Sequence, residues 1–302
     1  MIAANVAIWL LVTLTVLGAW FFFRRWSLTR PPLGTVNLGD VGFTLASIVA
    51  LPFLYLWLPG WVAGSLLAVT TLSLLWFLVE PVTPSPLARW GLAGGLVAAD
   101  VLLAWQPGTS STAFLLVNDA VIILVAIGVS VLWAQGGLRA RDLAILAGAI
   151  TLYDLVATGF LPLTTEMIDR LAGMPFLPMA AWPVGNGEWV GIGLGDLLMA
   201  AVAPLIFRKA FGKQAGMVAI AVALGIIAFV LGVSRWDALP ETFPTMIVLG
   251  PMIVAQYLLW SYRIGAERTT VSYQLEDIVR RRDDRLEPIG PRVPEETTTS
   301  VA

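Results

Sequence analysis

Two aspartates lie within long apolar stretches of the sequence: Asp154 in AITLYDLVATGF and Asp196 in GIGLGDLLMA. Charged side chains inside a bilayer are costly, and those found there usually serve a function. Neither aspartate has a Lys or Arg within its own apolar stretch. Two carboxylates at one site share a proton, so that one acts as the base and the other as the acid. The pair therefore predicts aspartic-type hydrolysis by water.

Several other catalytic chemistries are excluded by composition. The sequence contains no histidine and no cysteine. Zinc sites of the H-E-x-x-H type, Ser-His-Asp triads and thiolate nucleophiles are therefore ruled out. Acid–base chemistry is left to Asp, Glu, Tyr, Lys and Arg. We expect no metal and no organic cofactor, with water as the nucleophile.

The elements that must position the aspartates are membrane spans. Of the 302 residues, 58% are hydrophobic and only 13% are charged, about half the charged fraction usual in soluble domains. Apolar runs of about 20 residues, enough to cross a bilayer, recur along the chain. The nine predicted spans are 3–23, 41–58, 61–79, 87–105, 113–133, 143–163, 190–207, 216–233 and 243–262. Such spans predict an all-α multi-pass protein of the cell membrane.

The basic residues predict how the chain is oriented. The first span lacks a basic segment before it and is followed by FRRWSLTR, which is typical of a cytoplasmic C-terminal end. With the N-terminus outside and the C-terminus in the cytoplasm, every Lys and Arg except Arg170 and Arg235 falls on the cytoplasmic side. Residues 1–262 form the predicted membrane domain. The polar tail, 263–302, is predicted to form a short amphipathic helix or a solvated segment, followed by a disordered end.

The two aspartates are predicted to meet at similar depths. The spans 143–163 and 190–207 are consecutive and antiparallel, which places Asp154 about 14 Å and Asp196 about 9 Å from the outer surface. Gly191, Gly193 and Gly195 remove side-chain bulk before Asp196, so another backbone can approach closely. We expect this segment to offer partners to a substrate helix that is unwound for cleavage.

At these residues the sequence resembles the GxGD intramembrane aspartyl proteases, the presenilin and signal peptide peptidase family. That family has YD in its sixth span and GxGD in its seventh. They are matched by Tyr153–Asp154 and by Gly193–Leu194–Gly195–Asp196. The resemblance covers residues 1–262 and implies nine spans and two catalytic aspartates. The predicted orientation is similar to that of signal peptide peptidase, and the short linker to that of compact microbial members.

The resemblance also implies a substrate class and a supporting motif. The expected substrates are transmembrane helices or remnant signal peptides in the lipid bilayer, and no nucleic-acid partner is expected. The family carries PAL at the start of its last span, where this chain has Pro244–Thr245–Met246. Methionine preserves the bulk of leucine, whereas threonine adds a hydroxyl. Proline, which lacks a backbone N–H, is expected to keep the start of the span irregular.

Three alternatives remain open from the sequence. Prepilin peptidases also use GxGD, but they usually have a lysine two residues after the aspartate, where this chain has Leu198. A proton-coupled transporter could use Asp100, Asp154 and Asp196 as a relay, although no paired halves with broken helices are visible. An inactive homologue that binds transmembrane helices is the third alternative, favoured by the departure from PAL.

Overall fold

A computed structural model of the chain describes residues 2–28, 36–161, 163–185, 188–234, 243–268 and 272–273. Eight of its helices are long and apolar enough to cross a membrane. They are α1 (Ile2–Arg25), α2 (Leu38–Trp57), α3 (Gly60–Val79), α4 (Pro86–Trp105), α5 (Thr112–Gly136), α6 (Ala140–Gly159), α9 (Lys213–Ser234) and α10 (Met246–Ile264). The chain is therefore a multi-pass membrane protein.

The region around the predicted seventh span, 190–207, differs from the prediction. Its elements are helix α7 (Leu163–Leu171), strand β1 (Met179–Gly185), strand β2 (Glu188–Gly193) and helix α8 (Leu194–Phe211). The two strands pair antiparallel, so the start of this span is a strand and not a helix. Alternating glycines lower helix propensity, and strand β2 also contains the β-branched Val190 and Ile192. The prediction of an all-α fold is correct for the helix bundle but missed this hairpin.

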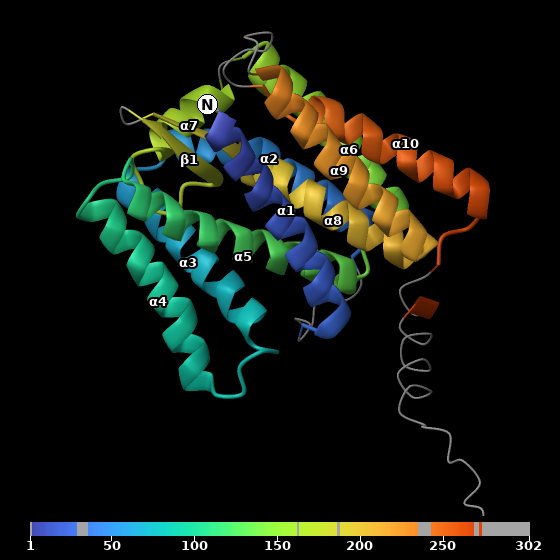
Figure 1. The fold of residues 1–302 in the computed structure, drawn as a ribbon, viewed down its shortest axis with the longest axis horizontal. Helices are drawn as coiled ribbons and strands as arrows, with labels where there is room; N and C mark the ends of the chain where they lie inside the picture. Colours follow the sequence, from blue (N-terminus) through green and yellow to red (C-terminus); the bar gives the residue numbers. More distant parts are fainter. Residues whose placement is uncertain are drawn as a thin grey trace, which may run out of the picture.

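Helix α8 occupies the centre of the bundle. It is 18 residues long and carries Asp196, Arg208 and Lys209, and it is not among the eight candidate spans. It packs against α1, α5, α6, α9 and α10, while α3 and α4 lie to one side of the bundle (Figure 1). Most of its side chains are buried, including Leu197 and Met199. The element that carries Asp196 is therefore held from several directions.

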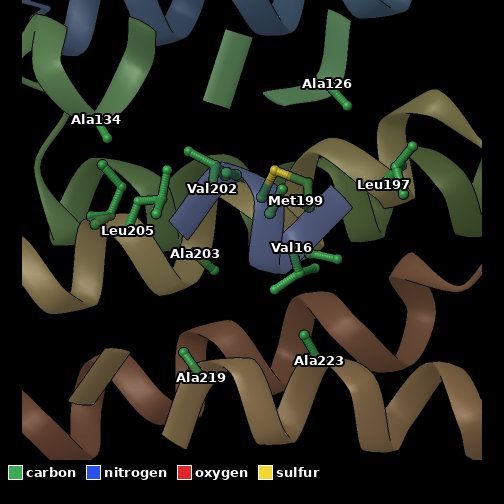
Figure 2. Packing of buried hydrophobic residues seen from close by; sticks show 14 of the residues in the cluster. Val16, Ala126, Ala134, Leu197, Met199, Val202, Ala203, Leu205, Ala219 and Ala223 are labelled. Atoms are coloured by element: carbon green, nitrogen blue, oxygen red, sulfur yellow. The ribbon is translucent and has the colours of Figure 1, made fainter. Parts of the chain in front are cut away.

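Small residues on the neighbouring helices allow this close packing. Ala126 and Ala134 of α5 and Ala219 and Ala223 of α9 lie around α8, as Figure 2 shows, together with Val16 of α1. Small side chains let helix backbones approach closely, which increases van der Waals contact where the bilayer supplies little hydrophobic driving force between helices. The position of α8 is thus defined by packing along most of its length.

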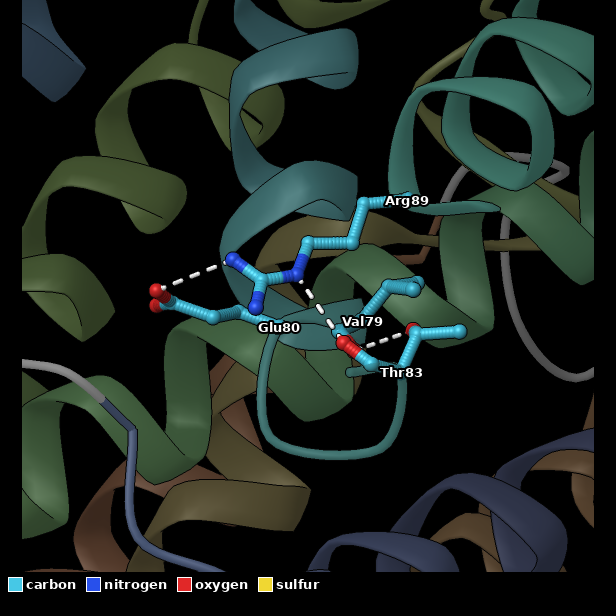
Figure 3. A network of polar contacts seen from close by, with 4 residues as sticks. All are labelled: Val79, Glu80, Thr83 and Arg89. Atoms are coloured by element: carbon cyan, nitrogen blue, oxygen red, sulfur yellow. Dashed lines mark hydrogen bonds and ion pairs between the residues drawn. The ribbon is translucent and has the colours of Figure 1, made fainter. Parts of the chain in front are cut away.

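Polar contacts fix the connections between several helices. Asn37 caps α2 in a capping box with Asp40, as expected for an acid at that helix start. Between α3 and α4, Arg89 donates to Glu80 at 3.3 Å and to the Thr83 carbonyl at 3.0 Å (Figure 3). The buried Lys209 of α8 donates to carbonyls at the end of α5 at 2.6 and 2.9 Å. These contacts bring the basic C-terminal end of α8 next to the α5–α6 connection.

The last span ends, and the tail begins, close to the predicted boundary at residue 262. Helix α10 ends at Ile264, and Glu267 then accepts the Ala140 N–H at 2.8 Å. The Arg268 N–H binds the Ala210 carbonyl at 3.1 Å. The start of the tail therefore packs against α6 and α8. The predicted amphipathic helix and disordered end fall almost entirely on residues 274–302, which lie outside the described residues.

Candidate functional site

Asp154 and Asp196 lie on helices that pack together, α6 and α8. Asp154 precedes the last residue of α6, Gly159, by five residues, or about 8 Å along the helix axis. This is nearer to the helix end than predicted, because α6 stops before residue 163. Asp196 lies in the first turn of α8, where unpaired backbone N–H groups favour a negative charge. Both aspartates are thus close to helix ends.

The two carboxylates form one polar site. They are close enough for Asp154 to act electrostatically on Asp196. Thr245 and the backbone of Met246 lie beside the Asp196 carboxylate. Both aspartates are intermediate between buried and exposed. Asp154 and Asp196 therefore lie near each other on two packed helices, α6 and α8.

Tyr153 contributes a second polar group beside the carboxylates. Its phenol interacts electrostatically with Asp154. The hydroxyl is buried and has no hydrogen-bond partner among the described residues. A buried phenol usually finds a partner, because leaving its hydroxyl unpaired is unfavourable. Tyr153 therefore carries an unsatisfied buried hydroxyl beside Asp154.

The GLGD residues straddle the junction between β2 and α8. Gly193 is the last residue of β2 and the N-cap of α8, and Leu194 and Gly195 begin the helix. A Cβ added to Gly193 would lie 3.7 Å from the Asp196 Oδ2, and one added to Gly195 would meet nothing within 4 Å. At Gly191, an added Cβ would approach the Ala180 carbonyl oxygen to 2.9 Å. The predicted close approach of a second backbone therefore occurs at Gly191, and that backbone belongs to strand β1.

The start of α10 completes the site. The predicted span began at residue 243, but α10 begins at Met246 with Thr245 as its N-cap. Pro244 lies before the helix, and its carbonyl accepts the Ile247 N–H at 3.1 Å in a tight first turn. The expected irregular start is therefore confirmed. Thr245 and Met246 are both buried, and both contact Asp196.

Two buried residues of α5, Asn118 and Asp119, fasten the hairpin that leads to Asp196. Asp119 accepts the Ala181 N–H at 2.7 Å. Asn118 donates to the Leu177 and Met179 carbonyls at 3.1 and 3.0 Å. Asp119 lies seven residues after the start of α5 and is only 2% exposed, so its carboxylate binds the hairpin backbone and does not cap its own helix. In the sequence, the signal for this role is the presence of two adjacent polar residues, Asn118 and Asp119, within an apolar span.

Asp100, on α4, also binds a backbone N–H near the hairpin. It is fully buried and accepts the Phe176 N–H at 2.8 Å. Phe176 has a φ of 59°, a left-handed conformation that is uncommon for a bulky residue. The Asp100 carboxylate stabilises this sharp bend just before β1. Asp100 is not beside Asp154 or Asp196, since α4 packs against α3 and α5.

The pairing register leaves one edge of the hairpin open. Ala180 pairs with Ile192, and the Leu194 N–H binds the Pro178 carbonyl at 2.9 Å. In an antiparallel ladder the alternate residues then direct their N–H and C=O groups away from the partner strand. On β1 these groups bind Asn118 and Asp119, so that edge is occupied. On β2 the corresponding groups of Gly191 have no bond to another described residue.

Replacing Asp119 with leucine is expected to destabilise the hairpin. Without the carboxylate, the buried Ala181 N–H loses its acceptor, which should lower the free energy of unfolding by about 1–3 kcal/mol. Thermal unfolding and hydrogen exchange of the Ala181 amide in nanodiscs measure this. Asp119→Asn is the matched control, because its amide oxygen can still accept the bond. Equal stability and equal Ala181 exchange in the leucine variant and the wild type would contradict the assignment.

No metal site accompanies these carboxylates in the described part of the chain: no group of three or more Asp or Glu side chains there could hold an ion. Comparison with known proteins gives no match, either to a protein-family model or to a curated protein. Any functional assignment therefore rests on the residues of the site itself.

Proposed function

We propose that this protein is an intramembrane aspartic endopeptidase that uses Asp154 and Asp196 as its catalytic pair. The observation that carries the proposal is that Asp154 and Asp196 lie on α6 and α8, two packed helices of a multi-pass membrane protein, near enough to interact electrostatically. The resemblance of the YD and GLGD motifs to the presenilin and signal peptide peptidase family supports it. In this proposal α8 is a ninth crossing, the N-terminus is outside and the C-terminus is cytoplasmic.

The proposed reaction is general acid–base hydrolysis. Water held between the carboxylates attacks the scissile carbonyl carbon. The ionised carboxylate takes a proton from the water, and the protonated one donates its proton to the carbonyl oxygen. The C–N bond of the tetrahedral intermediate then breaks, and the amine leaves with a proton returned by the pair. No metal or organic cofactor enters this scheme.

The open edge of β2 gives a place for the substrate backbone. A transmembrane helix must unwind before its peptide bond can be attacked, and its freed N–H and C=O groups then need partners away from water. The unpaired groups of Gly191 can hold an extended segment in this way, as sheet edges commonly do. Asp196 follows Gly191 by five residues in the chain. An added strand would therefore pass close to the catalytic pair.

The free hydroxyl of Tyr153 adds a polar contact for the same substrate. It is buried beside Asp154 and lacks a partner among the described residues. Donation to a substrate carbonyl would satisfy it and orient the peptide. The expected substrate class, transmembrane helices or remnant signal peptides, follows from the family resemblance and from the predicted orientation.

The decisive experiment is a cleavage assay in lipid. Purified protein in nanodiscs is mixed with a quenched fluorescent transmembrane peptide, and the products are identified by mass spectrometry. A matched peptide of uninterrupted leucines, which resists unwinding, should be cut more slowly. Cleavage within the apolar segment is the expected result. Its absence in folded protein, across several peptides, would favour the inactive homologue or the transporter.

A further inference from the structure

The first residues after α10 contact the far ends of both aspartate helices. The C-cap of α10, Gly265, has a φ of 88°, a left-handed conformation that favours glycine and turns the chain sharply. Two residues later, the Glu267 carboxylate accepts the Ala140 N–H of α6 at 2.8 Å. The next residue, Arg268, donates its backbone N–H to the Ala210 carbonyl of α8 at 3.1 Å. Neighbouring residues of the tail therefore join the start of α6 to the end of α8.

These bonds satisfy backbone groups that a helix leaves without partners of its own. The first N–H groups and the last C=O groups of a helix have no intrahelical partner. Arg139, the N-cap of α6, makes no side-chain cap, so the Glu267 carboxylate supplies an acceptor there from a distant part of the chain. The Arg268 guanidinium donates to the Arg208 carbonyl in the last turn of α8 at 3.2 Å. A negative group at a helix start and a positive group at a helix end both interact favourably with the helix dipole.

A contact with α1 holds the same segment from a third side. The Arg268 guanidinium lies 5.9 Å from the centre of the Tyr273 ring. This ring stacks on the buried Phe23 of α1, with ring centroids 6.0 Å apart and an angle of 19° between the ring planes. The start of the tail is therefore docked against three helices of the membrane domain, α1, α6 and α8.

The spacing from the tail to the aspartates is the same on both helices. Asp154 follows Ala140 by fourteen residues on α6, and Asp196 precedes Ala210 by fourteen residues on α8. At a rise of 1.5 Å per residue, each aspartate lies about 21 Å along its helix from the bond to the tail. The two helices pack together and run in opposite directions at this point. Holding the start of α6 beside the end of α8 therefore places the two aspartates at matching heights.

We propose that Glu267 and Arg268 are positioning residues that fix the axial register of α6 against α8, and with it the approach of Asp154 to Asp196. The inference rests on the proposed protease function, and it goes beyond it by giving the start of the tail a role in catalysis. Loss of the Glu267 carboxylate should let α6 shift along α8. Because catalysis is sensitive to small displacements of the reacting groups, turnover should fall more than substrate binding.

The test compares Glu267→Leu, which removes the acceptor, with Glu267→Gln, whose amide oxygen can still accept the Ala140 N–H. We expect the leucine variant to lose about tenfold in kcat per folded molecule, with KM within about twofold of wild type. The glutamine variant should stay within about threefold in kcat. Arg268→Gln keeps the backbone bond and loses the guanidinium, so its kcat should fall between the two. Arg263→Gln is the matched control and should retain wild-type kcat, because it removes an exposed charge in the last turn of α10.

A second measurement reads the register without relying on cleavage. The chain contains no cysteine, so Asp154→Cys/Asp196→Cys provides a single pair of thiols. Cross-linking of this pair by a short bis-maleimide in nanodiscs should be about fivefold slower or more when Glu267→Leu is added, and should recover with Glu267→Gln. Equal cross-linking rates with and without the leucine change, or equal kcat losses in the leucine and glutamine variants, would overturn the positioning role. If the wild type cuts no peptide but the leucine change slows cross-linking, the positioning role stands and the protease proposal fails.

Discussion

Replacing Asp154 or Asp196 with asparagine is expected to lower peptide cleavage by about 10³-fold or more. Asparagine has nearly the same size as aspartate, but it can neither carry the negative charge nor deliver an acidic proton. Each change therefore removes one half of the acid–base pair and leaves the helix packing intact. Initial rates on the quenched transmembrane peptide in nanodiscs measure the effect.

Two controls make this result specific. Asp169→Asn makes the same chemical change on the exposed surface of α7 and should retain full activity. The second control, Asp100→Asn, should also still cleave, because Asp100 binds the Phe176 N–H away from the pair and asparagine can accept that bond. Wild-type rates in either catalytic-pair variant would contradict the proposed dyad. A transporter relay through Asp100 predicts instead that Asp100→Asn abolishes proton-coupled uptake.

The sequence was sufficient to predict the eight candidate membrane helices and to single out Asp154 and Asp196. Spans of about 20 apolar residues are a local property, and Asp154 and Asp196 stand out because charges in them are costly. The position of α10 behind Pro244 was also predictable, since proline lacks the N–H that a helix interior needs. These features depend on residues close together in the chain.

The hairpin and its attachment could not be predicted in the same way. Glycine-rich segments suit either close helix packing or a strand, and the choice here depends on distant partners. Asp119 binds Ala181 across 62 residues of sequence, and Asn118 binds Met179 across 61. A side chain well inside one span that satisfies the backbone of a remote strand leaves only a weak local signal. Asp196 lies nearer the start of its helix than predicted for the same reason, because α8 begins at Leu194 and not at residue 190.

Gly250 gives the second prediction with a large expected effect. It lies on α10 where this helix crosses α6, and a Cβ added there would overlap the Thr151 Oγ1 and lie 2.9 Å from the Ala147 carbonyl oxygen. The Thr151 side chain can rotate away from the added Cβ. The Ala147 carbonyl belongs to the backbone, so it can make room only if α6 and α10 move apart. We expect Gly250→Ala to lower the free energy of unfolding by about 1–3 kcal/mol.

The same change should reduce catalysis beyond its effect on stability. Moving α10 away from α6 shifts Thr245 and Met246, and with them the Asp196 carboxylate, and a displacement of about 1 Å can cost about 100-fold in rate. Thermal unfolding and kcat in nanodiscs measure the two effects separately. Gly148→Ala, on α6, is the matched control, because its added Cβ would lie 3.9 Å from the Val254 Cγ2, an ordinary contact.

A double variant tests the cause of the Gly250 effect. Removing the Thr151 side chain in Gly250→Ala/Thr151→Ala relieves one of the two overlaps and leaves the Ala147 carbonyl in place. The combined loss of stability should therefore be smaller than the sum of the single losses, since the two residues are in direct contact. Strict additivity, or an equal loss in Gly148→Ala, would show that close approach of α6 and α10 at Gly250 does not set the geometry of the aspartate pair.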